Sequence, residues 1–182
     1  MQTGTPTQVA WSLNGSAFVV AGATPTFSWA DLQARNINDQ GSYNVQVRAT
    51  YAGGLVVTSA AAPLLTVTNT APTATMALST DTVNEGATGV QVVFGNGSDP
   101  SAADTTRGLL YSVDFDNDGV FDVVDSTQTT FTIPNTFLAD NRTLDVRGSV
   151  RDQAAAGDTN PASVGSTEMR ATLVIRDVAP TL

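Results

Sequence analysis

An acidic segment in the second half of the chain carries residues that could bind a metal ion. It reads Asp114-Phe-Asp116-Asn-Asp118-Gly119-Val-Phe-Asp122. Ca²⁺ binds six to eight oxygen ligands, mostly carboxylates and carbonyls. Asp at loop positions 1, 3 and 5, Gly at 6, a backbone carbonyl at 7 and Asp at 9 is a pattern typical of calcium loops. Without a cation, these like charges would repel one another at short range.

The spacing predicts which atoms would contact the ion. Val120 is expected to supply its backbone carbonyl, and Asp125, or alternatively Asp99, to complete the shell directly or through water. Gly119 would adopt a backbone angle that other residues avoid. Side-chain oxygens are expected from Asp114, Asp116, Asp118 and Asp122. The other interpretation is a solvated acidic turn, because Asp, Asn and Gly favour turns.

The distribution of charge favours the calcium site. The net charge is −9, from 17 acidic residues and eight basic residues, all of them Arg. Residues 1–69 are neutral, with two acids and two Arg, so the whole excess lies in residues 70–182, which contain the loop. Four further acids in residues 70–182 are a second, weaker cluster of candidate ligands, and we expect them instead to be surface acids that favour solubility: Asp140, Asp145, Asp152 and Asp158.

The composition excludes several classes of function. The chain has no Cys, His or Lys, which removes thiolate nucleophiles, the commonest general base and Schiff-base chemistry. We therefore expect no enzymatic activity. The negative charge argues against binding to nucleic acid, whose phosphates must be neutralised. No apolar run approaches the ~20 residues of a membrane span, and residues 1–6 do not have the pattern of a signal peptide.

The chain contains an internal repeat. Asn69-Thr-Ala71-Pro72-Thr73 recurs as Asp177-Val-Ala179-Pro180-Thr181, and a period of about 100 residues is that of one β-sandwich domain. We therefore expect residues 70–178 to form a complete repeat. Residues 1–69 would be the C-terminal portion of a preceding repeat, and residues 179–182 the start of the next. The alternative is that the first part is a shorter domain with its own topology.

Alternating apolar and polar residues with turn residues between them predict short strands. In the first part the expected strands are 9–13, 18–21, 26–29, 43–49, 55–58 and 65–68, with a helical turn or helix in 30–37. In the second part they are 73–78, 90–94, 109–114, 120–124, 129–133, 144–150 and 168–175. This pattern predicts an all-β fold of tandem immunoglobulin-like sandwiches with Greek-key connections, the first one incomplete.

Two segments resemble known features of such sandwiches. Asp39-Gln-Gly41-Ser-Tyr43 is similar to the tyrosine corner, in which a Tyr hydroxyl bonds to nearby backbone. The second repeat has Asp140-Asn-Arg142-Thr-Leu144 instead, where Leu144 is expected to fill core. As a whole, the second repeat resembles PKD-type bacterial immunoglobulin-like domains. The matching segments are Val83-Asn-Glu85-Gly86, Gly97-Ser-Asp99-Pro100 and Leu110–Gly119.

The resemblance implies a calcium-stabilised structural or adhesion repeat of a large secreted or cell-surface bacterial protein. Its partners would be neighbouring repeats of the same chain and a surface protein or glycan. The alternative is a carbohydrate-binding or accessory module of an extracellular hydrolase, which predicts a row of exposed aromatic side chains. The acidic loop also resembles those of integrin-type propellers, but only one copy is present. Strand-like flanks argue against an EF-hand.

Overall fold

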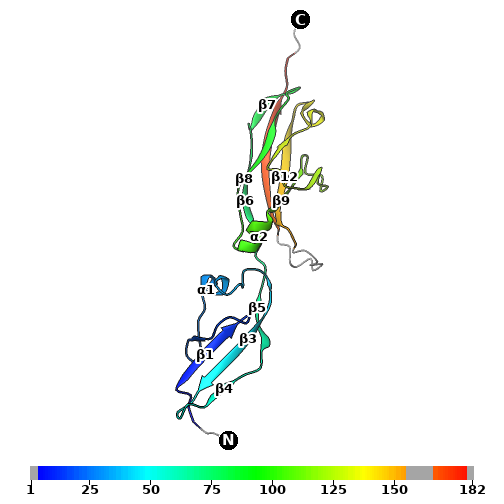
Figure 1. The fold of residues 1–182 in the computed structure, drawn as a ribbon. Helices are drawn as coiled ribbons and strands as arrows, with labels where there is room; N and C mark the ends of the chain where they lie inside the picture. The colour runs from blue at the N-terminus through cyan, green and yellow to red at the C-terminus, as the bar shows by residue number, and fades with distance from the viewer. Residues whose placement is uncertain (1–3, 155–165, 180–182) are drawn as a thin grey trace. The chain divides into compact units, whose positions relative to one another are not determined.

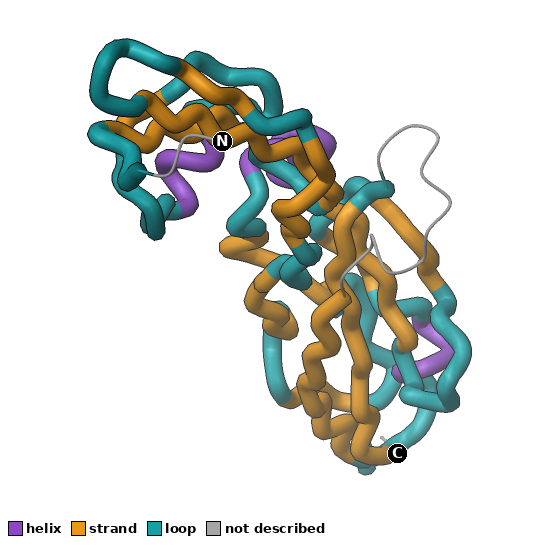
Figure 2. Tube along the Cα trace, turned by 90° about the horizontal axis from the view of Figure 1, so that it is seen from below, coloured by secondary structure: helices purple, strands orange, loops and turns teal. Residues whose placement is uncertain are grey.

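A computed structural model of the chain describes residues 4–154 and 166–179. The chain divides into two compact units, with the boundary between Thr68 and Asn69. Strands are the main regular structure of both units and the helices are short (Figures 1 and 2), so the expected all-β fold is confirmed. Within the described residues, no helix is both long and apolar enough to span a membrane.

The first unit is built on one five-stranded sheet. Its elements are β1 (Gln8–Leu13), β2 (Val19–Val20), α1 (Trp29–Gln33), β3 (Gly41–Thr50), β4 (Val56–Thr58) and β5 (Ala62–Val67). The central strand β3 pairs with β1 along one edge, and with β5 and then β4 along the other. All described strands of this unit belong to that single sheet.

Local sequence signals explain most of the first unit. Asn14 and Gly15 both have positive φ angles, 51° and 73°, and the amide of Ser16 donates to the carbonyl of Leu13 at 2.9 Å. These are the features of a type I′ turn, which matches the twist of a hairpin. The hydroxyl of Tyr43 donates to the carbonyl of Asp39 at 2.7 Å, so the predicted tyrosine corner is confirmed.

The expected strand at residues 26–29 is wrong. Trp29 is the first residue of α1, and Ser28 is its N-cap. The hydroxyl of Ser28 accepts from the amide of Asp31, while the Asp31 carboxylate accepts from the amide of Ser28 at 2.9 Å. This reciprocal capping box satisfies amides at the start of the helix, and it outweighs the strand propensity of the preceding residues.

The second unit is an immunoglobulin-like β-sandwich. One sheet has the order β10-β9-β12-β13-β7 and the other β11-β8-β6. Between β8 and β12 the chain passes repeatedly from one sheet to the other, as Greek-key sandwiches do. The strands are β6 (Thr73–Leu78), β7 (Thr82–Asn84), β8 (Gln91–Ser98), β9 (Leu109–Asp114), β10 (Val123–Ser126), β11 (Thr130–Thr132), β12 (Arg142–Asp152) and β13 (Ser166–Arg176), with helices α2 (Ala102–Arg107) and η1 (Asn135–Leu138).

The expected strands of the second unit are all present, with shifted bounds in several cases. β6 and β9 have the expected bounds, whereas β10 begins at Val123, three residues later than expected, because the acidic loop continues to Asp122. β7 was not predicted. It is only three residues long, too short for an alternating pattern, and it is held by parallel pairing with β13.

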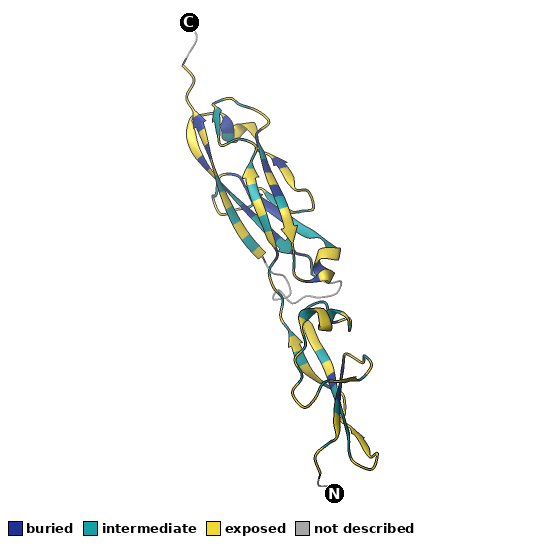
Figure 3. Cartoon of the chain, turned by 90° about the vertical axis from the view of Figure 1, so that its left-hand side faces the viewer, coloured by how far each residue is buried: buried dark blue, intermediate teal, exposed yellow. Residues whose placement is uncertain are grey.

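The core of the second unit lies between its two sheets. Buried and exposed residues alternate along the strands (Figure 3), and β12 buries every second residue from Leu144 to Asp152. Leu144 is 2% exposed, so the expectation that it fills core is confirmed. The ring of Phe94 lies 4.9 Å from that of Tyr111 and 6.0 Å from that of Phe131. The contact between Phe94 and Tyr111 connects the facing sheets, whereas Phe94 and Phe131 lie on neighbouring strands of one sheet.

Candidate metal centres

The acidic loop connects β9 to β10, and Asp114 organises it. This residue ends β9, lies opposite Arg147 of β12 and is fully buried. Its Oδ1 accepts from the amide of Asp118 at 3.2 Å and its Oδ2 from the amide of Gly119 at 3.1 Å. Gly119 has a φ angle of 100°, which confirms its expected role at the turn.

Three of the predicted ligands come together in this loop. Asp114, Asp116 and Asp122 each place a carboxylate oxygen within 4.8 Å of those of the other two. Two oxygens bound to Ca²⁺ at about 2.4 Å can lie up to about 4.8 Å apart, so this spacing fits a shared ion. Asp122 is also held in place, because its Oδ2 accepts from the amide of Phe115 at 2.7 Å.

Two other predicted ligands, Asp118 and Asp125, lie outside this close group. Asp118 is exposed, and its Oδ1 accepts from the amide of Val120 at 2.8 Å, while the side chain of Val120 is 69% exposed. Asp125 lies where the pairing of β10 with β9 shifts register, and both of its oxygens accept from Arg151 at 2.6 Å. These hydrogen bonds hold the pKa of Asp125 below its usual value. The carboxylate of Asp125 is therefore already paired with the guanidinium of Arg151.

Arg147 offsets part of the charge of the loop. Its guanidinium lies 3.2 Å from Oδ2 of Asp114 and 3.5 Å from Oε1 of Glu168. It also stacks over the ring of Phe121, with 4.3 Å from Cζ to the ring centroid. A second Arg, Arg170, donates to Oδ1 of Asn117 in the loop at 2.7 Å. Two Arg beside the four Asp residues from 114 to 122 still leave the loop negative, which favours binding of a cation.

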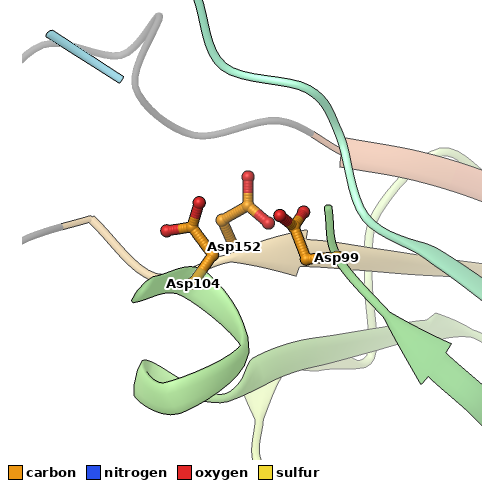
Figure 4. A group of neighbouring side chains, drawn as sticks. All are labelled: Asp99, Asp104 and Asp152. Atoms are coloured by element: carbon orange, nitrogen blue, oxygen red, sulfur yellow. The ribbon is translucent and has the colours of Figure 1, made fainter. Parts of the chain in front are cut away.

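A second acidic group, which the sequence analysis did not find, lies elsewhere in the second unit (Figure 4). Asp99 comes from the loop after β8, Asp104 from the first turn of α2 and Asp152 from the end of β12. Each offers a carboxylate oxygen within 4.8 Å of the other two. Asp104 and Asp152 are fully buried, and Asp99 is half-buried.

The prediction that Asp152 is a surface acid is therefore wrong. The signal was its register, because Asp152 continues the alternation that buries Val146 and Val150 along β12. Asp140 and Asp145 are exposed, as expected. Asp158 lies outside the described residues.

Several hydrogen bonds fix the second group. The amide of Asp104 donates to the Ser101 hydroxyl at 3.2 Å, which caps α2. Oδ1 of Asp99 accepts from the amide of Ser101 at 2.6 Å, and the side-chain amide of Asn69 donates to Oδ2 of Asp152 at 2.8 Å. Arg107, at the other end of α2, forms an ion pair with Oδ1 of Asp104.

The electrostatics of the second group are unfavourable in the absence of a cation. Burial raises the pKa of Asp99 from 3.8 to about 6, and the neighbouring charge of Asp152 adds to the increase. Desolvation and a like charge both disfavour the ionised form of a carboxyl group. A proton or a bound cation would relieve this repulsion.

The aromatic side chains do not form an exposed surface. Every Trp, Tyr and Phe of the described residues is buried or half-buried. A groove of about 390 Å³ in the first unit includes Trp11 and Phe27 in its lining, but the indole N–H of Trp11 is bonded to the carbonyl of Gly22 at 2.8 Å. The row of exposed aromatic side chains required by the carbohydrate-binding alternative is therefore not seen.

Comparisons with known proteins leave the family of the chain open. No protein family model matches the sequence, and no curated protein matches it. Among solved structures, the chain is similar to one described as "Structures of Clostridium thermocellum CbhA fibronectin(III)-like modules", with 14% sequence identity and a TM-score of 0.35. The match covers 97% of this chain and 82% of that one. At this TM-score the assignment of the fold rests on the sheets described above.

Proposed function

We propose that this chain is a calcium-stabilised structural repeat of a large secreted or cell-surface bacterial protein, with a role in adhesion or in spacing other domains. The observation that carries the proposal is the convergence of Asp114, Asp116 and Asp122 from one hairpin loop. All three are hard oxygen ligands, the type that Ca²⁺ prefers. The recurrence of the Ala-Pro motif supports a tandem arrangement. Its partners are then the neighbouring repeats and a surface protein or glycan.

Calcium would act by stabilising the folded hairpin. The three carboxylates lie close together only when β9 and β10 are paired, so the ion binds the folded state preferentially. Such binding adds about 3–4 kcal/mol to the free energy of unfolding when the ion is present at roughly 100–1,000 times its dissociation constant. Because the chain contains no Cys, no disulfide stabilises the sandwich. The sandwich would therefore gain substantially from a bound ion.

Asp116 provides the sharpest test of this site. Its side chain is exposed, and within the described residues no hydrogen bond or ion pair is found for its carboxylate. Asp116→Asn should therefore leave the fold intact, unlike changes at Asp114 or Asp122, which also hold backbone amides. Isothermal titration of the full chain with Ca²⁺ should show one binding event weakened at least tenfold in this variant.

Asp81→Asn is the matched control, because Asp81 is exposed and lies in the turn between β6 and β7. It removes the same charge and should bind Ca²⁺ as the wild type does. The proposal fails if Asp116→Asn and the wild type give identical titrations, or if the wild type shows no binding in the loop at millimolar Ca²⁺.

A further inference from the structure

The second acidic group lies apart from the loop, and we propose that Asp99, Asp104 and Asp152 form a second, independent site for a divalent cation of the calcium type (Figure 4). The three side chains come from three different elements of the second unit. The site would therefore connect α2, the loop after β8 and the end of β12. The proposal does not depend on the acidic loop.

Unpartnered buried oxygens set this group apart from an ordinary acidic cluster. Asp104 is 0% exposed, and its Oδ2 is buried without a hydrogen-bond partner. Oδ2 of Asp99 is also buried without a hydrogen-bond partner. A buried carboxylate oxygen that accepts no hydrogen bond has lost its hydration without compensation. A cation bound between these oxygens would supply the missing interaction.

The charges of the group match a divalent ion. Three carboxylates lie together, and Arg107 forms an ion pair with one of them, that of Asp104. Arg151 donates to the backbone carbonyl of Asp152 at 2.9 Å, but its charge is shared with both oxygens of Asp125. Arg107 therefore offsets part of the negative charge of the group, and a bound divalent cation would offset more of it.

The ligand atoms indicate a hard cation. All three side chains offer carboxylate oxygens, and the chain contains no His or Cys, the ligands that zinc and other transition metals prefer. A spacing of up to 4.8 Å between oxygens fits Ca²⁺–O distances of 2.3–2.6 Å. The side-chain amide of Asn69, which donates to Oδ2 of Asp152 at 2.8 Å, would turn its oxygen toward a bound cation if it rotated by about 180°.

Asp99→Asn separates a cation site from a purely structural role. The amide oxygen of Asn can still accept from the amide of Ser101, as Oδ1 of Asp99 does at 2.6 Å. The –NH₂ group would replace the unpartnered Oδ2, which removes the repulsion in the metal-free protein. In a chelator, the variant should melt at the same temperature as the wild type or higher. In excess Ca²⁺ it should melt lower than the wild type, with the affinity of this site reduced at least tenfold.

If Asp99 has only a structural role, Asp99→Asn should change the melting temperature in the same direction in a chelator and in excess Ca²⁺. That result would overturn the proposal. Titration of the full chain with Ca²⁺ then separates the two sites. The wild type should show two binding events, Asp116→Asn should lose the one in the loop, and Asp99→Asn should lose the other. Asp104→Asn serves as a second variant. If both Asp99→Asn and Asp104→Asn keep two events, the second site does not exist, whatever the result for the loop.

Discussion

Gly148 allows the two sheets of the second unit to pack closely, and its replacement should be costly. This residue is buried at the centre of β12. A Cβ atom added there would lie 2.8 Å from Cζ and 2.9 Å from Cε1 of Phe94, and would also overlap Sδ of Met76. The Met side chain is flexible and can move away. Phe94 is 3% exposed and lies between Tyr111 and Phe131, so its ring has no free space.

Gly148→Ala should therefore lower the free energy of unfolding of this unit by about 1–3 kcal/mol, the usual cost of overpacking a core. Urea denaturation followed by far-UV circular dichroism measures the effect, because both Trp residues of the chain lie in the first unit and fluorescence would report mainly on that unit. At a slope of about 2 kcal/mol per molar urea, a loss of 2 kcal/mol lowers the midpoint by about 1 M, while the slope stays unchanged.

Gly95→Ala is the matched control. Its added Cβ meets only Oγ1 of Thr75, at 3.2 Å, at the end of a small side chain. The midpoint should therefore move little. The reasoning is refuted if Gly148→Ala is as stable as the wild type, or if the two substitutions are equally destabilising.

Three further perturbations test the account. Tyr43→Phe removes the 2.7 Å hydrogen bond to Asp39 and should destabilise the first unit by about 1 kcal/mol in urea denaturation; an unchanged midpoint would show that the corner is dispensable. Leu144→Ala leaves a cavity in the second unit and should cost about 2–5 kcal/mol in the same assay; a loss below 1 kcal/mol would contradict its place in the core. Because the folded chain raises the pKa of Asp99 from 3.8 to about 6, it holds that proton more tightly than the unfolded chain does. In a chelator, stability relative to Asp99→Asn should therefore decline as pH rises from about 4 to about 6, by roughly 1–2 kcal/mol because partial exposure screens the effect. A constant difference across this interval would contradict the prediction.

Local patterns in the sequence were sufficient for much of the fold. The alternation that marks β6 and β9 gave their bounds, and Asn14-Gly15 gave a turn whose backbone angles require residues that tolerate positive φ. The spacing of Asp114, Asp116 and Asp122 indicated residues that the structure brings together. Each of these features depends on neighbours within about ten residues in the chain.

Features that depend on distant neighbours were missed. Asp152 was assigned to the surface because charged residues are seldom buried. Its burial depends on Asp104 and on Asn69, which lies 83 positions away in the sequence. Arg151 lies 26 positions from Asp125 in the sequence, so the spacing of residues within the acidic loop could not predict their ion pair. Tertiary contacts of this kind decide which carboxylates are available to a metal ion.

A thermal melt of the full chain in excess Ca²⁺ and in a chelator tests the central claim most directly. Stabilisation by about 3–4 kcal/mol should raise the melting temperature of the second unit by about 10–20 °C. The shift should be reduced in Asp116→Ala/Asp118→Ala and abolished when Asp99→Asn is added to that variant. Identical melting temperatures of the wild type with and without Ca²⁺ would contradict the account.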